Sequence, residues 1–318
     1  MSSQTSSIKG TLHQFSDNPE LTCFEHDVAH DSPGSNVIVV IPGLNGSYPP
    51  VPYTEALSQH LQNKLDWTIV ELGGLSSAGP GYGAVTVFQD AKEIGLCVRF
   101  LRQVRHKTKI VLMGHSTGCQ DAVAYCHLNA QEPNAAPPVE GIILQAPVSD
   151  REFIINTAPI SIVPLLITQY PGLRPHPGQT YSDFVDRRLS NLFGTKLGIT
   201  YTRWNSLVSK AESDKITWAN EDYFSSDMTT KRWSNVFEPM RQNNTRTLIV
   251  LSGKDESYGP TADLTKVDKL KGLFGNALSS QGSGGQNVVV LPEADHAVSD
   301  EDSRSRLFET VTNFLSQL

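Results

Sequence analysis

Short apolar runs alternate with amphipathic stretches along most of the chain. Six of these runs predict buried strands, at 37–41, 67–72, 109–114, 141–147, 247–253 and 287–296. Four segments predict helices, at 53–65, 87–104, 117–129 and 301–317. Two runs near the start, at 11–15 and 21–26, predict one or two edge strands. Strands that alternate with helices in this way are typical of an α/β fold, with a mostly parallel central sheet flanked by helices.

One region interrupts this alternation. Residues 148–246 separate two predicted strands and hold three of the four tryptophans together with the apolar run at 159–168. The region is too long for a crossover helix, so we expect an inserted cap or lid. The core domain would then comprise residues 1–147 and 247–318, because strands of the same character resume after the insertion. An independent second domain is the alternative.

Composition narrows the class of protein. The 318 residues carry a net charge of −7, which disfavours nucleic-acid binding because no basic surface would neutralise phosphates. No apolar run reaches the roughly 20 residues that span a bilayer, and the first residues lack a secretory pattern. We therefore expect a cytoplasmic protein without stable membrane insertion.

The cysteines give no sign of a metal site. None of the four belongs to a Cys-x-x-Cys pair, which makes a zinc cluster an unfavourable interpretation. They are predicted to be small buried thiols, and are Cys23, Cys97, Cys119 and Cys126. No metal and no organic cofactor is therefore expected.

The most informative motif is Gly114-x-Ser116-x-Gly118, between the strand at 109–114 and the helix at 117–129. At such a junction this pattern forms a nucleophile elbow, a sharp turn that projects the serine hydroxyl above the sheet. Glycines flank the serine because the turn leaves little space for neighbouring side chains. The following helix directs its positive end towards negative charge that develops in the reaction.

A serine nucleophile needs a base and an acid, and both are found after later strands. His296 ends the run at 287–296, and Asp255 comes shortly after the strand at 247–253. The order serine, acid, histidine is the one expected for this strand arrangement. Asp255 would orient the imidazole, with Glu256 and Asp263 as fallback acids. The sequence therefore predicts a catalytic triad of Ser116, Asp255 and His296.

The reaction also needs two backbone N–H groups that stabilise the oxyanion. Thr117, directly after the nucleophile, is expected to supply one of them. The loop after the strand at 37–41 should supply the other, from Leu44 in preference to Gly43 or Asn45.

The segments "GHSTGCQD" at 114–121 and "GYG…QDAKEIGLCVRFLR" at 81–102 give the chain a resemblance to a known family. The fold is similar to that of the α/β-hydrolase superfamily. Within it, the chain resembles a mainly fungal family of intracellular siderophore esterases, long catalogued as a domain of unknown function. The resemblance implies a serine esterase whose small-molecule substrate is an ester of N-hydroxyornithine units, carrying ferric iron as cargo, and hence a place in iron metabolism.

Aromatic residues could form the wall of a cleft for such a substrate. The candidates are Trp204, Trp218 and Trp233, while Tyr82, in the loop at 73–83, could hydrogen-bond to the substrate. The alternatives are that the tryptophans form the core of the cap and that the loop is a plain flexible crossover.

Two other functions stay open. A general carboxylesterase or lipase would use the run at 159–168 as an apolar lid. A ligand receptor would keep the hydrolase fold with little turnover.

Overall fold

The computed structural model describes most of the chain. The described residues are 7–27, 35–44, 46, 48–77, 81–159, 173–193, 197–259, 264–279 and 288–318.

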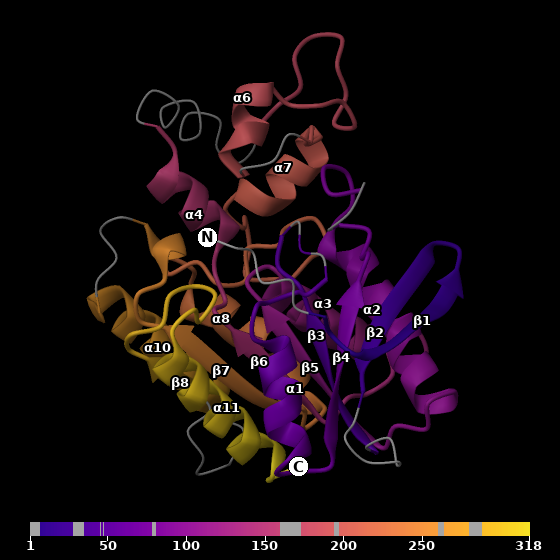
Figure 1. Cartoon of the computed structure of the whole chain (residues 1–318). Helices are drawn as coiled ribbons and strands as arrows, with labels where there is room; N and C mark the ends of the chain where they lie inside the picture. Colours follow the sequence, from indigo (N-terminus) through magenta and orange to yellow (C-terminus); the bar gives the residue numbers. More distant parts are fainter. Residues whose placement is uncertain are drawn as a thin grey trace.

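Eight strands in the described residues form one sheet (Figure 1). They are β1 (Gly10–Asp17), β2 (Glu20–His26), β3 (Asn36–Ile41), β4 (Trp67–Gly73), β5 (Lys109–His115), β6 (Gly141–Gln145), β7 (Arg246–Ser252) and β8 (Val288–Leu291). Their order is β1-β2-β4-β3-β5-β6-β7-β8. Pairs β1/β2 and β2/β4 are antiparallel, and the other pairs are parallel. The prediction of a mostly parallel sheet is therefore confirmed. Of the two strands near the start, β1 lies at the edge of the sheet, whereas β2 pairs with both β1 and β4.

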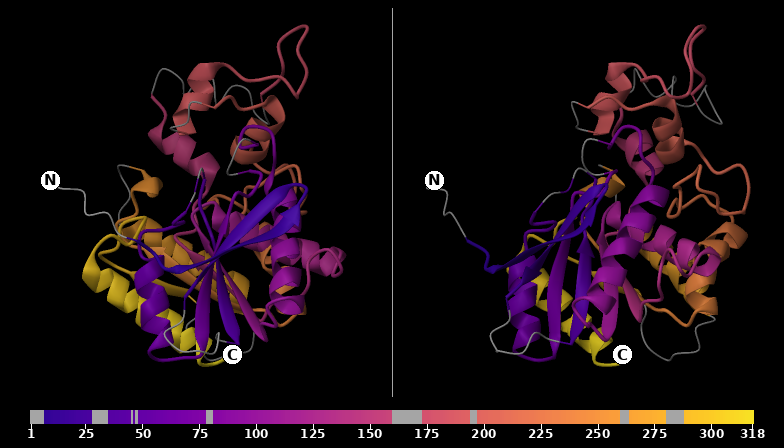
Figure 2. Two further views of the ribbon diagram at one scale, coloured as in Figure 1. Left: turned by 45° about the vertical axis from the view of Figure 1, so that its right-hand side comes forward. Right: turned by 90° about the vertical axis from the view of Figure 1, so that its right-hand side faces the viewer.

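Helices cover both faces of this sheet, as predicted (Figures 1 and 2). Those described are α1 (Thr54–Gln62), α2 (Val87–Gln103), α3 (Gly118–Gln131), α4 (Asp150–Thr157), α6 (Arg187–Ser190), α7 (Tyr201–Val208), α8 (Thr230–Val236), α9 (Glu238–Gln242), α10 (Leu264–Leu278) and α11 (Glu301–Leu315). Two 3₁₀ turns accompany them, η1 (Asn191–Phe193) and η2 (Glu256–Tyr258). Within the described ranges no helix combines the length and the apolar character needed to cross a bilayer.

Strand β3 shows why its run of apolar residues is buried on both sides. Val37, Val39 and Ile41 face the cluster that contains α2, α3 and α10. Ile38 and Val40 face the opposite cluster, which contains α1 and α11. Successive side chains of a strand point to opposite faces, so a strand between two helical layers is apolar at every position.

The described residues between β6 and β7 fall into two groups. Helices α4, α6 and α7 lie beyond the carboxyl ends of the strands (Figure 1) and share an apolar cluster around Trp204. Helices α8 and α9 instead pack against α10 and α3, and Trp233 of α8 belongs to the core of the sheet domain. A cap over 148–246 stays a prediction, and its apolar run at 159–168 lies outside the described residues apart from Pro159.

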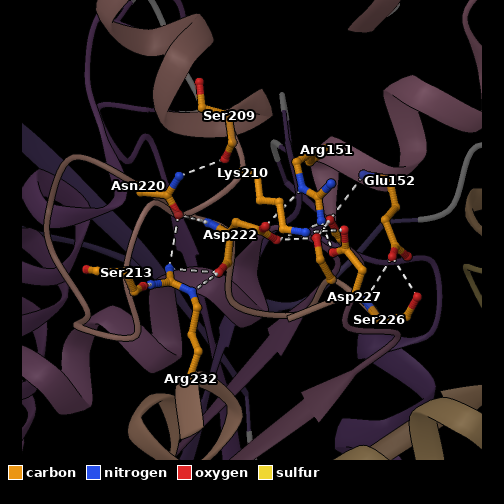
Figure 3. A network of polar contacts seen from close by, with 12 residues as sticks. Arg151, Glu152, Ser209, Lys210, Ser213, Asn220, Asp222, Ser226, Asp227 and Arg232 are labelled. Carbon is orange, nitrogen blue, oxygen red and sulfur yellow. Dashed lines mark hydrogen bonds and ion pairs between the residues drawn. The ribbon is translucent and has the colours of Figure 1, made fainter. Parts of the chain in front are cut away.

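Ion pairs fix the irregular segment between α7 and α8 (Figure 3). Arg151 of α4 donates from Nε to Asp222 Oδ2 at 2.9 Å and pairs with Asp227, which also accepts from Lys210 Nζ at 3.0 Å. Arg232 of α8 donates to the carbonyl oxygen of Asp222 at 3.0 Å. The segment is thus tied to α4 on one side and to α8 on the other.

The four cysteines are buried and free, as predicted. They pack with the apolar side chains of the α2 and α3 face of the sheet.

Candidate active site

Ser116 occupies a strained turn between β5 and α3. Its backbone φ is 55°, a left-handed conformation that serine adopts only where the surroundings impose it. A Cβ at Gly114 would lie 2.2 Å from the Gly118 carbonyl oxygen, and one at Gly118 would lie 2.5 Å from that of Ile41. Only glycine therefore fits on either side, and the turn has the geometry of a nucleophile elbow.

His296 and Asp255 face each other beyond the ends of β8 and β7. His296 Nδ1 lies 3.0 Å and 2.9 Å from the two carboxylate oxygens of Asp255. Asp255 is buried, and its Oδ1 also accepts from the N–H of Ser257 at 2.9 Å. Burial lowers the pKa of His296, but the hydrogen bond and the charge of Asp255 outweigh burial and leave that pKa above its ordinary value. The pair can therefore hold the imidazole in one orientation and stabilise its charged form.

Gln145, the last residue of β6, lies between the serine and the histidine. The N–H of Ser116 donates to the carbonyl oxygen of Gln145 at 3.1 Å. The side-chain Nε2 of Gln145 donates to the carbonyl oxygen of His296 at 3.3 Å. The ring of His115, next to the serine, lies 4.8 Å from the ring of His296 between centroids. The elbow and the histidine therefore meet at the same edge of the sheet.

The loop after β3 passes directly beside the serine. A Cβ at Gly43 would lie 3.0 Å from the Cβ of Ser116 and 3.5 Å from its Oγ. Neither the N–H of Thr117 nor that of Leu44 donates to an acceptor in the described part of the chain. Two backbone donors near the nucleophile suit an oxyanion, and Asn45 lies outside the described residues.

Two of the aromatic candidates, Trp218 and Trp233, pack against the core of the sheet domain. Trp233 is buried edge-on to Phe274, with centroids 4.8 Å apart, and Trp218 lies against Phe88 of α2 at 4.3 Å. Both contacts belong to the sheet-domain core, and no contact of the described residues joins either tryptophan to Ser116.

Tyr82 and Trp204 belong to the cluster under α4 and α7. Tyr82 is fully buried, its carbonyl oxygen accepts from Arg203 Nε at 3.4 Å, and Trp204 packs edge-on to Phe193. Both side chains therefore act as packing residues in the described structure, and a role towards substrate stays a prediction.

A second buried polar group lies beside the elbow helix and was not expected from the sequence. Arg203 of α7 is fully buried and pairs with the buried Glu221. Gln120 of α3 donates from Nε2 to Asp150 Oδ2 at 2.8 Å. Burial, together with the charge of Glu221, raises the pKa of Asp150 to about 7.

Two further carboxyl groups complete this Arg203 cluster. Burial raises the pKa of Asp90 to about 6, although Ser77 donates to it from its N–H at 3.0 Å. Burial also raises the pKa of Asp121 well above its usual range, with Asp90 as a nearby like charge. The Arg203 cluster is thus one guanidinium among Asp90, Asp121, Asp150 and Glu221, and it joins α2, α3, α4 and α7.

One residue of the candidate site, Gln145, was not named from the sequence. Gln145 stands where an apolar strand ends in a polar residue at the reactive edge, a signal that could have marked it. Glu256, expected only as a fallback acid, accepts the N–H of His296 at 3.0 Å. Asp263, the other fallback acid, lies outside the described residues.

The described residues contain no group of three or more histidine, cysteine, aspartate or glutamate side chains arranged to hold a metal ion.

Two similar proteins of known sequence are named as esterases. The chain is 25% identical to the fusarinine C esterase sidJ of Aspergillus fumigatus, over 98% of this chain and 96% of the relative. It is 26% identical to the esterase AN6793 of Emericella nidulans, over 80% of this chain and 77% of the relative.

Solved structures agree with this classification. A siderophore hydrolase, EstB from Aspergillus fumigatus, superposes with a TM-score of 0.78 at 25% identity, over 99% of this chain and 98% of that one. A monoglyceride lipase of Saccharomyces cerevisiae, at 14% identity and a TM-score of 0.55 over 99% of this chain and 96% of that one, shares the fold. The fold is that of an α/β-hydrolase, and the comparisons class the chain with the carboxylic ester hydrolases. The family described as "Protein of unknown function (DUF1749)" matches residues 1–316, and the chain therefore belongs to it.

Proposed function

We propose that the protein is a serine esterase in which Ser116 is the nucleophile, His296 the base and Asp255 the acid. The contact of His296 Nδ1 with both oxygens of Asp255, at the edge that carries the elbow, is the observation that supports this most directly. The imidazole then has its other nitrogen available to accept the serine proton. The arrangement needs no metal or organic cofactor.

The proposed reaction proceeds through an acyl-enzyme. Ser116 Oγ attacks the ester carbonyl while His296 accepts its proton, and the N–H groups of Thr117 and Leu44 stabilise the oxyanion. The tetrahedral intermediate collapses, and the alcohol leaves with the proton from His296. Water then attacks the acyl-enzyme with His296 again as base, which releases the acid and restores the serine.

The pH dependence follows from the environment of the base. His296 must be neutral to accept a proton, and Asp255 raises its pKa. Activity is therefore expected to rise with pH as His296 loses its proton, over a range above the ordinary pKa of about 6.5.

The proposed substrate is a fusarinine-type hydroxamate siderophore, with ferric iron as its cargo. Two relatives are named for siderophore or fusarinine C hydrolysis, and both align over nearly the whole chain. Ester cleavage would separate the linked chelating units, which lowers their effective concentration around the iron and promotes its release. A cap formed by α4, α6 and α7 beyond the reactive edge, and a cytoplasmic location, belong to the same proposal.

The test is incubation of the protein with ferric and iron-free fusarinine C, beside p-nitrophenyl esters, with products identified by mass spectrometry. Ser116→Ala is the control and should lower kcat by on the order of 10⁴- to 10⁶-fold, down to the contribution of the oxyanion donors. Retention of most activity in this variant would refute the mechanism.

The same assay separates the alternative functions. Hydrolysis that rises on micelles of long-chain esters, without siderophore cleavage, would indicate a lipase. Tight siderophore binding with no product would indicate a receptor.

A further inference from the structure

Gln145 has a fully buried side chain at the centre of the candidate active site. Its Oε1 accepts from the hydroxyl of Tyr53 at 2.9 Å and lies 2.6 Å from Nδ1 of His115. Its Nε2 donates to the carbonyl oxygen of His296 at 3.3 Å. One amide therefore contacts the start of α1, the elbow and the loop after β8.

The neighbours determine which way this amide points. Tyr53 is a hydroxyl donor, and burial together with His296 lowers the pKa of His115 to about 4, so that this ring is neutral near pH 7. A neutral His115 with its proton on Nδ1 donates to the same oxygen as Tyr53 does. The nitrogen of Gln145 is then directed at His296, which offers a carbonyl acceptor.

The main chain of His296 is consequently held from both sides. Its N–H donates to Glu256 Oε2 at 3.0 Å, and its carbonyl oxygen accepts from Gln145. Asp255 holds the ring itself through Nδ1. The histidine is thus fixed by partners from the ends of β6 and β7.

Gln145 also holds the elbow, through its own backbone. Its carbonyl oxygen accepts the N–H of Ser116 at 3.1 Å and the thiol of Cys119 at 3.3 Å. Gln145 therefore contacts both the main chain of His296 and the turn that carries Ser116. It connects the two residues: its carbonyl oxygen binds the Ser116 N–H, and its side-chain Nε2 binds the His296 carbonyl oxygen. These two hydrogen bonds set the separation between Ser116 and His296.

We infer that Gln145 is a positioning residue, whose side-chain amide fixes the His296 main chain relative to the Ser116 elbow. The inference rests on the proposed function, because it assigns Gln145 a role in the same reaction. Its physical basis is that reacting groups misplaced by about 1 Å lose on the order of 10²-fold in rate.

The first test replaces the amide by an apolar side chain of similar length. Gln145→Met should lower kcat on p-nitrophenyl acetate by about 10- to 100-fold and leave KM within about threefold, because this small ester does not depend on the amide for binding. Full activity in this variant would overturn the inference.

The second test uses an ionisable isostere, Gln145→Glu. Its protonated carboxyl group can still donate to the His296 carbonyl oxygen and accept from Tyr53, whereas the ionised form only accepts. The titratable groups around the position are Tyr53, His115, Cys119, Asp255 and His296. The kcat profile should become bell-shaped, since His296 must lose a proton and the introduced group must keep one.

A profile of unchanged shape in Gln145→Glu would contradict the inference, because a merely structural defect would lower activity equally at every pH. Gln120→Met is the matched control, since Gln120 is another buried glutamine whose amide binds Val148 and Asp150. It should keep kcat within about threefold, and a loss as large as that of Gln145→Met would count against a specific role. Thermal unfolding of each variant confirms that it is folded.

The Ser116→Ala protein separates the two levels of the proposal. If it keeps its activity, the proposed function fails. If it is inactive while Gln145→Met is fully active, only the role of Gln145 fails.

Discussion

Two buried polar networks lie side by side in this protein, and they are built differently. Around Gln145 and Asp255, every buried side-chain oxygen and nitrogen of these two residues has a hydrogen-bond partner. In the Arg203 cluster, buried atoms of Asp121, Arg203 and Glu221 have no partner among the described residues. A buried polar atom without a hydrogen-bond partner costs free energy, so the side chains of the Arg203 cluster are held less completely than those of Gln145 and Asp255.

The networks also differ in their balance of charge. Asp255 is one carboxylate beside one histidine, which can accept a proton and become its counter-ion. Arg203 is one cation among four buried carboxyl groups, and burial raises the pKa of three of these groups. The first network is therefore expected to control rate, and the second to control stability.

The largest expected effect tests the first network. Asp255→Asn keeps the shape of the acid but removes its charge and favours the wrong tautomer of His296, so kcat should fall on the order of 10⁴-fold. The acidic limb of the kcat/KM profile should also move to lower pH, since Asp255 raises the pKa of His296. Steady-state kinetics from pH 5 to 9 measure both, and a loss under tenfold would be incompatible with a triad.

A smaller effect, on stability, tests the second network. Glu221→Leu leaves the Arg203 guanidinium buried without its ion-pair partner, which should lower the free energy of unfolding by about 3 to 5 kcal/mol. Chemical denaturation measures this change. The kcat of the folded protein should stay within about threefold, because neither residue contacts the triad among the described residues.

The matched control is the double variant Arg203→Met/Glu221→Leu. Removal of both charges should destabilise the protein less than Glu221→Leu alone, because no guanidinium is left buried without its ion-pair partner and Asp90, Asp121 and Asp150, whose pKa values burial already raises, can be protonated. Equal or greater loss in the double variant would show that the unpaired Arg203 guanidinium does not cause the destabilisation of Glu221→Leu.

The smallest expected effect concerns the pH dependence of stability, which the Arg203 cluster should control through Asp150. Asp150 has a folded pKa raised to about 7, above an unfolded value of about 3.9, so its stabilising contribution is present at low pH and is lost as pH rises towards 7. Asp150→Asn cannot titrate and should flatten the pH dependence of unfolding by up to about 1.4 kcal/mol per pH unit in that range.

The free energy of unfolding and kcat/KM should respond to pH in opposite directions. Over the range in which protonation of Asp150 is lost, neutralisation of His296 should increase kcat/KM. An Asp150→Asn protein whose unfolding keeps the full pH dependence of the unmodified chain would show that another group is responsible.

Much of the fold could be predicted from local patterns. The apolar run at 37–41 is buried on both faces as β3, and the segment at 87–104 is the amphipathic helix α2. The elbow at Ser116 was equally accessible, because the need for glycine at Gly114 and Gly118 is a steric property of a short turn. The triad itself stays a prediction that the contact between His296 and Asp255 supports.

The packing partners of the aromatic residues could not be predicted from local patterns. Trp204 and Trp233 look alike in the sequence, yet Trp204 packs in the apolar cluster of α4, α6 and α7, whereas Trp233 packs in the core of the sheet domain. Their burial depends on which helices return to the sheet domain, and a count of tryptophans in 148–246 carries no information on that.

The sequence by itself determined the alternation of strands and helices, the strained turn at Ser116 and the chain order of the candidate serine, acid and histidine, since each depends on neighbouring residues or on chain order. Only the tertiary structure decided that the Gln145 side chain donates a hydrogen bond to His296, 151 positions away, and accepts one from Tyr53, 92 positions away. Such partners follow from the order of strands in the sheet, which brings the ends of β3, β5, β6, β7 and β8 to one edge. Hydrophobic periodicity specifies which face of a strand is buried, but it does not specify which distant polar group will contact a given side chain of that strand.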